Sequence, residues 1–159
     1  MYISYKEYTA LYDYFDEKLF NRLAFDACRY IDRLTTGVDG VKKLKVAFPL
    51  NEDDAAAVKR CAAHIVNFLH QIHEAEKSAS VGRGYEQTSN GLRGRVVSSV
   101  TAGSESVSYS AGTQKTAVDV AVESPAERER MIREMVREYL SGVADANGVN
   151  LLYMGRYPG

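Results

Sequence analysis

The sequence predicts a mainly α-helical protein, a small helical bundle that carries a β-hairpin insertion and an extended C-terminal tail. Apolar residues recur at spacings of three and four in several long segments, and residues that cap helices precede those segments. A stretch rich in Gly, Ser and Val then interrupts the helical pattern. The chain has 159 residues, of which 45% are apolar, so we expect a single domain over residues 1–159.

The first helix is expected at about residues 4–12, because Ser4 and Glu7 have the S-x-x-E spacing of a capping box. Aromatic residues are dense around it: Tyr2, Tyr5, Tyr8, Tyr12, Tyr14 and Phe15. Their rings can pack in a core, or they can form an interface in which the hydroxyl groups still reach hydrogen-bond partners. The sequence leaves both alternatives open.

Two longer helices are expected at about residues 16–36 and 51–77, capped by Asp16 and Asn51. The first has an apolar face made of Leu19, Leu23, Ala27, Tyr30, Ile31 and Leu34. The second has a continuous stripe made of Val58, Cys61, Ala62, Ile65, Phe68, Leu69 and Ile72. At 1.5 Å per residue the second helix would span ~40 Å, so we expect it to be the spine of the domain.

A flexible loop is expected at residues 78–95, where four glycines favour irregular structure. Short runs rich in Val, Ser and Tyr then predict a β-hairpin at about 96–110. An isolated two-stranded ribbon is only marginally stable in water, so this hairpin needs a partner surface.

The last helix is expected at about residues 124–141. Ser124 is its cap, Pro125 occupies the first position, Glu127 would complete a capping box and Gly142 follows the end. The tail at 143–159 contains Leu151, Leu152, Tyr153 and Met154. It is too short to form its own core and too apolar for a solvated tail, so we expect it to dock on another surface.

Composition excludes several broad classes. The formal net charge is −1, with 20 basic and 21 acidic residues, so no global field draws the protein to nucleic acid or to an anionic membrane. No apolar run approaches the roughly 20 residues of a membrane span, and no leader pattern opens the chain, so we expect an unexported protein. Cys28 and Cys61 lack metal-ligand spacing and are expected to be reduced thiols.

No motif predicts catalysis, a cofactor or a metal. His70 and His73 share a helix face, but no third ligand is evident, and His64 stands apart from them. The glycines between 82 and 91 have neither dinucleotide-fingerprint nor P-loop spacing, and no serine lies in a G-x-S-x-G elbow. We therefore expect a protein that is not an enzyme.

Four segments, in their order along the chain, carry a resemblance to a known family. They are Tyr2-Ile-Ser-Tyr-Lys-Glu-Tyr8, the helix from Phe20 to Thr35, Gly103-Ser-Glu-Ser-Val-Ser-Tyr109 and Leu151-Leu-Tyr-Met-Gly155. With these segments the chain resembles the head-tail connector, or adaptor, proteins of tailed bacteriophages and their prophage remnants. The likeness runs nearly end to end.

The resemblance implies a structural virion protein of the neck, made in the host bacterial cytoplasm. Such a protein forms a ring, usually dodecameric, under the portal protein, extends the DNA channel and receives head-closure or tail-completion proteins. Rings need heterologous contacts, for which the hairpin and tail are natural donors. We therefore expect these subunit or portal contacts: Val96, Val100, Val107, Tyr109, Leu151, Leu152, Tyr153 and Met154.

Three arginines in the predicted loop, Arg83, Arg93 and Arg95, are candidates for transient contact with passing DNA, because a ring would repeat them around its channel. The alternatives are an ordinary solvated loop and an inter-subunit ion-pair region. Another neck component, such as a head-closure or tail-terminator protein, is an alternative for the whole chain, although those proteins tend to be richer in β-structure. A further alternative is a small DNA-binding regulatory protein that uses the loop arginines and Lys42 to Lys45.

Overall fold

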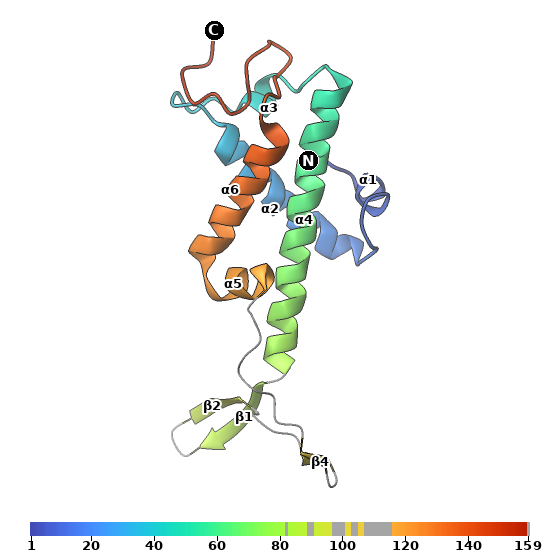
Figure 1. The fold of residues 1–159 in the computed structure, drawn as a ribbon, viewed down its shortest axis with the longest axis vertical. Coiled ribbons are helices and arrows are strands. Elements are labelled where there is room, and N and C mark those ends of the chain that lie inside the picture. The colour runs from blue at the N-terminus through green and yellow to red at the C-terminus, as the bar shows by residue number, and fades with distance from the viewer. Residues whose placement is uncertain (82, 89–90, 97–100, 103–104, 107–115, 159) are drawn as a thin grey trace.

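The protein is mainly helical, as the sequence predicts (Figure 1). The computed structural model describes residues 1–81, 83–88, 91–96, 101–102, 105–106 and 116–158. Its helices are α1 Tyr5–Thr9, α2 Glu17–Thr35, α3 Lys43–Val46, α4 Glu52–Val81, α5 Ala117–Glu123 and α6 Pro125–Leu140. None of the helices in the described part of the chain is both long and apolar enough to cross a membrane.

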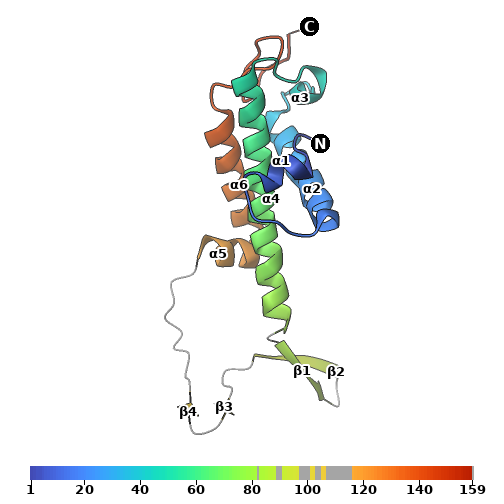
Figure 2. The ribbon, with the colours of Figure 1, turned by 90° about the vertical axis from the view of Figure 1, so that its right-hand side faces the viewer.

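Helix α4 is the spine of the bundle, with α2, α5 and α6 packed along it (Figures 1 and 2). Its 30 residues correspond to ~45 Å, longer than the sequence predicts. The expected stripe is buried except for the half-buried Leu69, and Ala63 and Val66 are fully buried as well. Burial extends beyond one stripe because helices cover α4 on more than one side.

The predicted caps of the first helices are confirmed. Ser4 and Glu7 form a complete capping box at α1, and the Asp16 side chain accepts a hydrogen bond from the Leu19 amide at the start of α2. Asn51 Oδ1 accepts hydrogen bonds from the amides of Asp53 and Asp54, at 2.9 and 3.1 Å. These local bonds satisfy N–H groups that have no partner within their own helix.

The start of α6 differs in one detail from the prediction. Ser124 accepts from the Glu127 amide and Pro125 occupies the first turn, as expected. The Glu127 carboxylate, however, pairs with Arg130 at 2.8 Å. Electrostatic attraction to a guanidinium on the next turn therefore accounts for this carboxylate's position.

The segment between α4 and α5 requires a correction. Strand β1 (Arg83–Thr88) pairs antiparallel with β2 (Gly91–Val96), where the sequence predicts a loop at 78–95, and α4 continues to Val81. The hairpin insertion expected at 96–110 is not supported. Only β3 (Thr101–Ala102) and β4 (Glu105–Ser106) pair there, over two residues each, and the rest of 97–110 lies outside the described residues.

The C-terminal tail folds back onto the end of its own bundle, beside α3 and the start of α4 (Figure 1). Its Leu151 is fully buried. The side chain of Lys43, which is also fully buried, donates to the backbone oxygens of Leu151 and Tyr153. The expectation that the tail needs another surface for docking is therefore wrong for Leu151, which belongs to the core of its own chain.

Candidate functional site

The predicted tail contacts divide into core and surface. Leu151 is buried and Leu152 packs half-buried against the core. Tyr153 and Met154 remain 53% and 54% exposed. Only the last two therefore present large apolar surface to a partner.

The other predicted contacts lie outside the part of the chain whose side chains the structure describes. This holds for Arg83, Arg93, Arg95 and Val96 in the paired strands, and Val100, Val107 and Tyr109 are not described at all. Their contacts remain predictions. The structure does describe the lysines at 42–45 that were considered for DNA contact. Lys43 is buried, and Lys45 lies 3.5 Å from Asp32.

Other exposed apolar residues, which the sequence did not single out, lie at the same end of the molecule as the tail. The Val38 amide donates to the Met154 oxygen at 3.1 Å, so the loop after α2 adjoins the tail. Val46 of α3 and Leu50, just before α4, also lie at this end of the molecule. We call this surface the bundle end and define its apolar part as Val38, Val46, Leu50, Tyr153 and Met154, all at least 53% exposed.

Most of the N-terminal aromatic residues pack within the chain. Tyr8 is 1% exposed and its ring packs against Tyr12, Phe15 and Phe20. Burial, together with the hydrogen bond that the Tyr2 hydroxyl donates to Asp32, raises the pKa of Tyr2. Tyr14 is the exception, at 80% exposure. Of the two alternatives that the sequence left open, core packing and an interface, these residues therefore pack in the core. Tyr14 lies on the surface.

One side of α2 combines positive charge with an exposed aromatic ring. Lys18, Arg22, Phe25 and Arg29 are all exposed, and their spacings of four, three and four residues place them on one helix face. We call these four residues the α2 face. Phe25 is 62% exposed in the middle of it, a position from which an amphipathic helix normally excludes large apolar residues.

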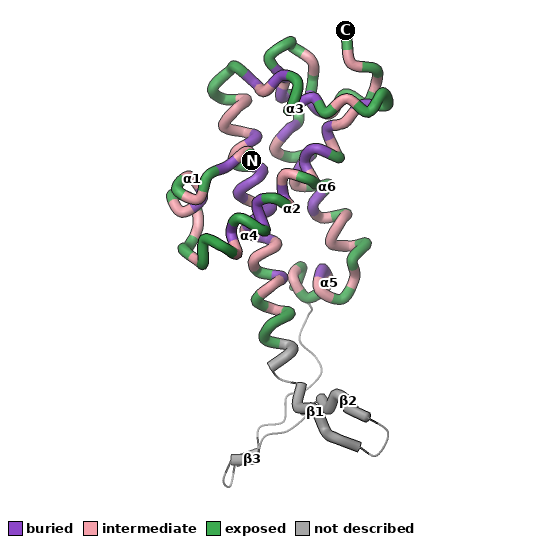
Figure 3. The backbone as a smooth tube through the Cα atoms, turned by 180° about the vertical axis from the view of Figure 1, so that it is seen from behind, coloured by how far each residue is buried: buried purple, intermediate pink, exposed green. Residues whose placement is uncertain are grey.

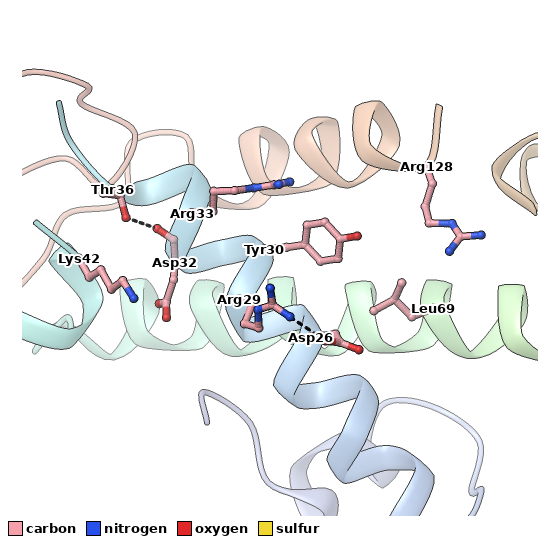
Figure 4. Close-up of a pocket in the computed structure, with 9 residues that line it drawn as sticks. All are labelled: Asp26, Arg29, Tyr30, Asp32, Arg33, Thr36, Lys42, Leu69 and Arg128. Atoms are coloured by element: carbon pink, nitrogen blue, oxygen red, sulfur yellow. Dashed lines mark hydrogen bonds and ion pairs between the residues drawn. The ribbon is translucent and has the colours of Figure 1, made fainter. Parts of the chain in front are cut away.

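A cleft of about 630 Å³ lies beside the α2 face (Figure 4). Arg29, Tyr30 and Arg33 project from α2, Leu69 comes from α4, and Arg128 comes from the first turn of α6. The remaining lining residues are Asp26, Asp32, Thr36 and Lys42. Four cationic and two anionic side chains therefore surround a partly apolar floor.

Most charges in the cleft are already partnered. Arg33 reaches Glu129 at 2.6 Å and Arg128 reaches Glu76 at 2.9 Å. The guanidinium of Arg33 also lies 5.3 Å from the centre of the Tyr30 ring, a cation–π contact. These pairs tie α2 and α4 to α6, so we assign them first to holding the bundle together.

His64, His70 and Cys61 pack against other side chains of the bundle. The His70 ring stacks on Phe15 with centroids 3.9 Å apart, and burial lowers its pKa. His64 Nδ1 lies 3.0 Å from the Tyr139 hydroxyl. Burial raises the pKa of the Cys61 thiol to about 12, so it is not a thiolate at neutral pH. Within the described residues, no three potential metal ligands converge.

The bundle end and the α2 face are therefore the candidate surfaces for macromolecular contact. Figure 3 shows exposed segments, in green, at the end of the bundle near α3 and the C-terminus. Comparisons with protein-family models, with curated proteins and with solved structures find no match to this chain.

Proposed function

We propose that the chain is a structural head-tail connector protein of a tailed bacteriophage. In this role it forms a ring under the portal protein, extends the DNA channel and joins the head to tail-completion proteins. The observation that carries the proposal is the pair of unburied contact surfaces, the bundle end and the α2 face, on a small helical domain. Surfaces of different shape and charge suit the heterologous contacts of a ring.

A further feature supports this function over other neck components. The fold is mainly helical, whereas head-closure and tail-terminator proteins are expected to be richer in β-structure.

The proposal is tested by electron microscopy of the purified full-length protein in negative stain, alone and with the portal protein encoded in the same genome. We expect annular particles with a central channel that attach coaxially to portal rings. Particles without a channel, together with no attachment to the portal, would overturn the proposed function.

A further inference from the structure

We propose that the α2 face receives the bundle end of a second copy of this chain, so that these two surfaces form the contact between neighbouring subunits. This inference rests on the proposed ring and names the surfaces that would build it. A helix side in one copy meets a helix end in the next, and such a heterologous contact leaves one free surface of each kind for further copies.

The α2 face carries positive charge that its own chain does not neutralise. In the described part of the chain, no ion pair joins Lys18 or Arg22 to a carboxylate. Among the described residues, Arg29 pairs only with Asp26 of the same helix, at 3.7 Å, and the two side chains are 72% and 44% exposed. A water-exposed pair of this kind contributes little, so Arg29 stays available to a stronger partner.

One part of the bundle end, the start of α4, carries the complementary charge. Leu50 is 83% exposed, and it is followed by the exposed carboxylates of Glu52 and Asp53 in the first turn of α4. Neither carboxylate takes part in an ion pair within the described residues. Leu50 is therefore an exposed apolar side chain beside two carboxylates. Phe25 is likewise an exposed apolar side chain, beside the positive charges of Arg22 and Arg29.

Contact between the two surfaces would bury the exposed apolar side chains and pair the opposite charges. Contact between Phe25 and Leu50 removes apolar area from water, worth about 25 cal/mol per Å². The charges around them would then attract each other in a less polar environment than bulk water. Apolar anchors surrounded by charged pairs are a common arrangement in protein interfaces.

The start of α4 does not reach Lys18 and Arg22 within one copy. Helices α2 and α4 run in opposite directions along the bundle, and Lys18 and Arg22 lie in the half of α2 away from the bundle end (Figures 1 and 2). A second copy also fits better than duplex DNA, because Asp26 and Glu17 on the same helix interrupt the positive charge and Phe25 offers nothing to a phosphate backbone.

The test uses paired charge reversals in the full-length protein. The first variant carries Arg22→Glu with Arg29→Glu, and the second carries Glu52→Lys with Asp53→Lys. Analytical ultracentrifugation should show each variant as a monomer at concentrations where the wild-type protein assembles. An equimolar mixture should recover the large species, because both contacts in an alternating assembly again join opposite charges.

A matched control reverses the same number of charges elsewhere, with Arg60→Glu and Arg137→Glu on exposed positions of α4 and α6. It should assemble like the wild type, and circular dichroism should show native helix content for all variants. Recovery on mixing is a readout that misfolded variants could not give.

Two results would overturn the inference while leaving the ring intact: normal assembly of either charge-reversed variant, or no recovery on mixing. Retention of the wild-type monomer on duplex DNA at physiological salt, lost in the Arg22→Glu, Arg29→Glu variant, would instead assign the α2 face to nucleic acid. A wild-type protein that never self-associates contradicts the proposed function itself, and this contact with it.

Discussion

Leu151 and Met154, two residues of the tail, differ in their burial. Leu151 is 0% exposed, whereas Met154 is 54% exposed. We expect Leu151→Ala to lower the free energy of unfolding by about 2–5 kcal/mol, because it leaves a cavity in the core. Met154→Ala should change it by less than about 0.5 kcal/mol. Urea denaturation followed by circular dichroism measures both, and equal effects would contradict the placement of the tail.

The sequence could not separate these two residues. Apolar residues in a helix are assigned to the core by their period, but residues 149–154 have no regular period to use. The buried Lys43 was equally hidden, because a lysine is expected on the surface unless its ammonium group finds buried acceptors. Here those acceptors are tail carbonyl oxygens more than a hundred positions away in the chain.

Glu7 makes stability depend on pH. Hydrogen bonds from Lys59 and Ser4 lower the pKa of the Glu7 carboxyl from 4.5 to about 2. The ionised carboxylate therefore stabilises the fold fully above pH 4.5, and this contribution is lost as the pH falls from 4.5 towards 2. Because Glu7 and Lys59 are partly exposed, we expect a modest effect.

The corresponding variant is Glu7→Gln, which removes the ionisable group at similar size. Its urea midpoint should fall below that of the wild type at neutral pH, and the two midpoints should converge towards pH 2. Parallel curves over that range would show that Glu7 does not titrate with folding.

At the scale of elements, the long helices and the capped helix α1 could be predicted, whereas α3 and α5 could not. α2, α4 and α6 have repeated apolar positions and clear caps, and each appears close to its predicted bounds. α3 and α5 have four and seven residues, too few for a helical period to stand out. The only available signal for α5 was the capping box formed by Thr116 and Asp119.

That cap is testable because a seven-residue helix depends strongly on its ends. The Thr116 hydroxyl oxygen accepts from the Asp119 amide at 3.2 Å. We expect Thr116→Ala to cost about 1 kcal/mol and to speed hydrogen exchange in α5. Ser78→Ala, at an exposed position of α4, is the control. Unchanged exchange in α5 would show that the cap does not hold this helix.

For the whole molecule, the distribution of charge is more informative than its total. A net charge of −1 hides a positive α2 face and an acidic first turn of α4 at the bundle end. If these surfaces join subunits, added salt should weaken assembly, because the Debye length falls from about 10 Å at 0.1 M to about 3 Å at 1 M. Sedimentation across this range should show smaller species at high salt, and salt-independent assembly would indicate a purely apolar contact.

The bundle end and the α2 face could not be predicted in full from the sequence. Phe25, Val38 and Leu50 appear in the sequence as ordinary apolar residues, and only the fold shows that they stay exposed. The tail residues Tyr153 and Met154 were predicted as contacts, and they lie at the bundle end with side chains available.

The most direct test of the central claim is the native mass of the full-length protein by multi-angle light scattering over a wide concentration range. The ring proposal predicts a closed oligomer whose mass reaches a plateau at an integral multiple of the monomer. A strictly monomeric protein at every concentration, or aggregates that grow without limit, would contradict it.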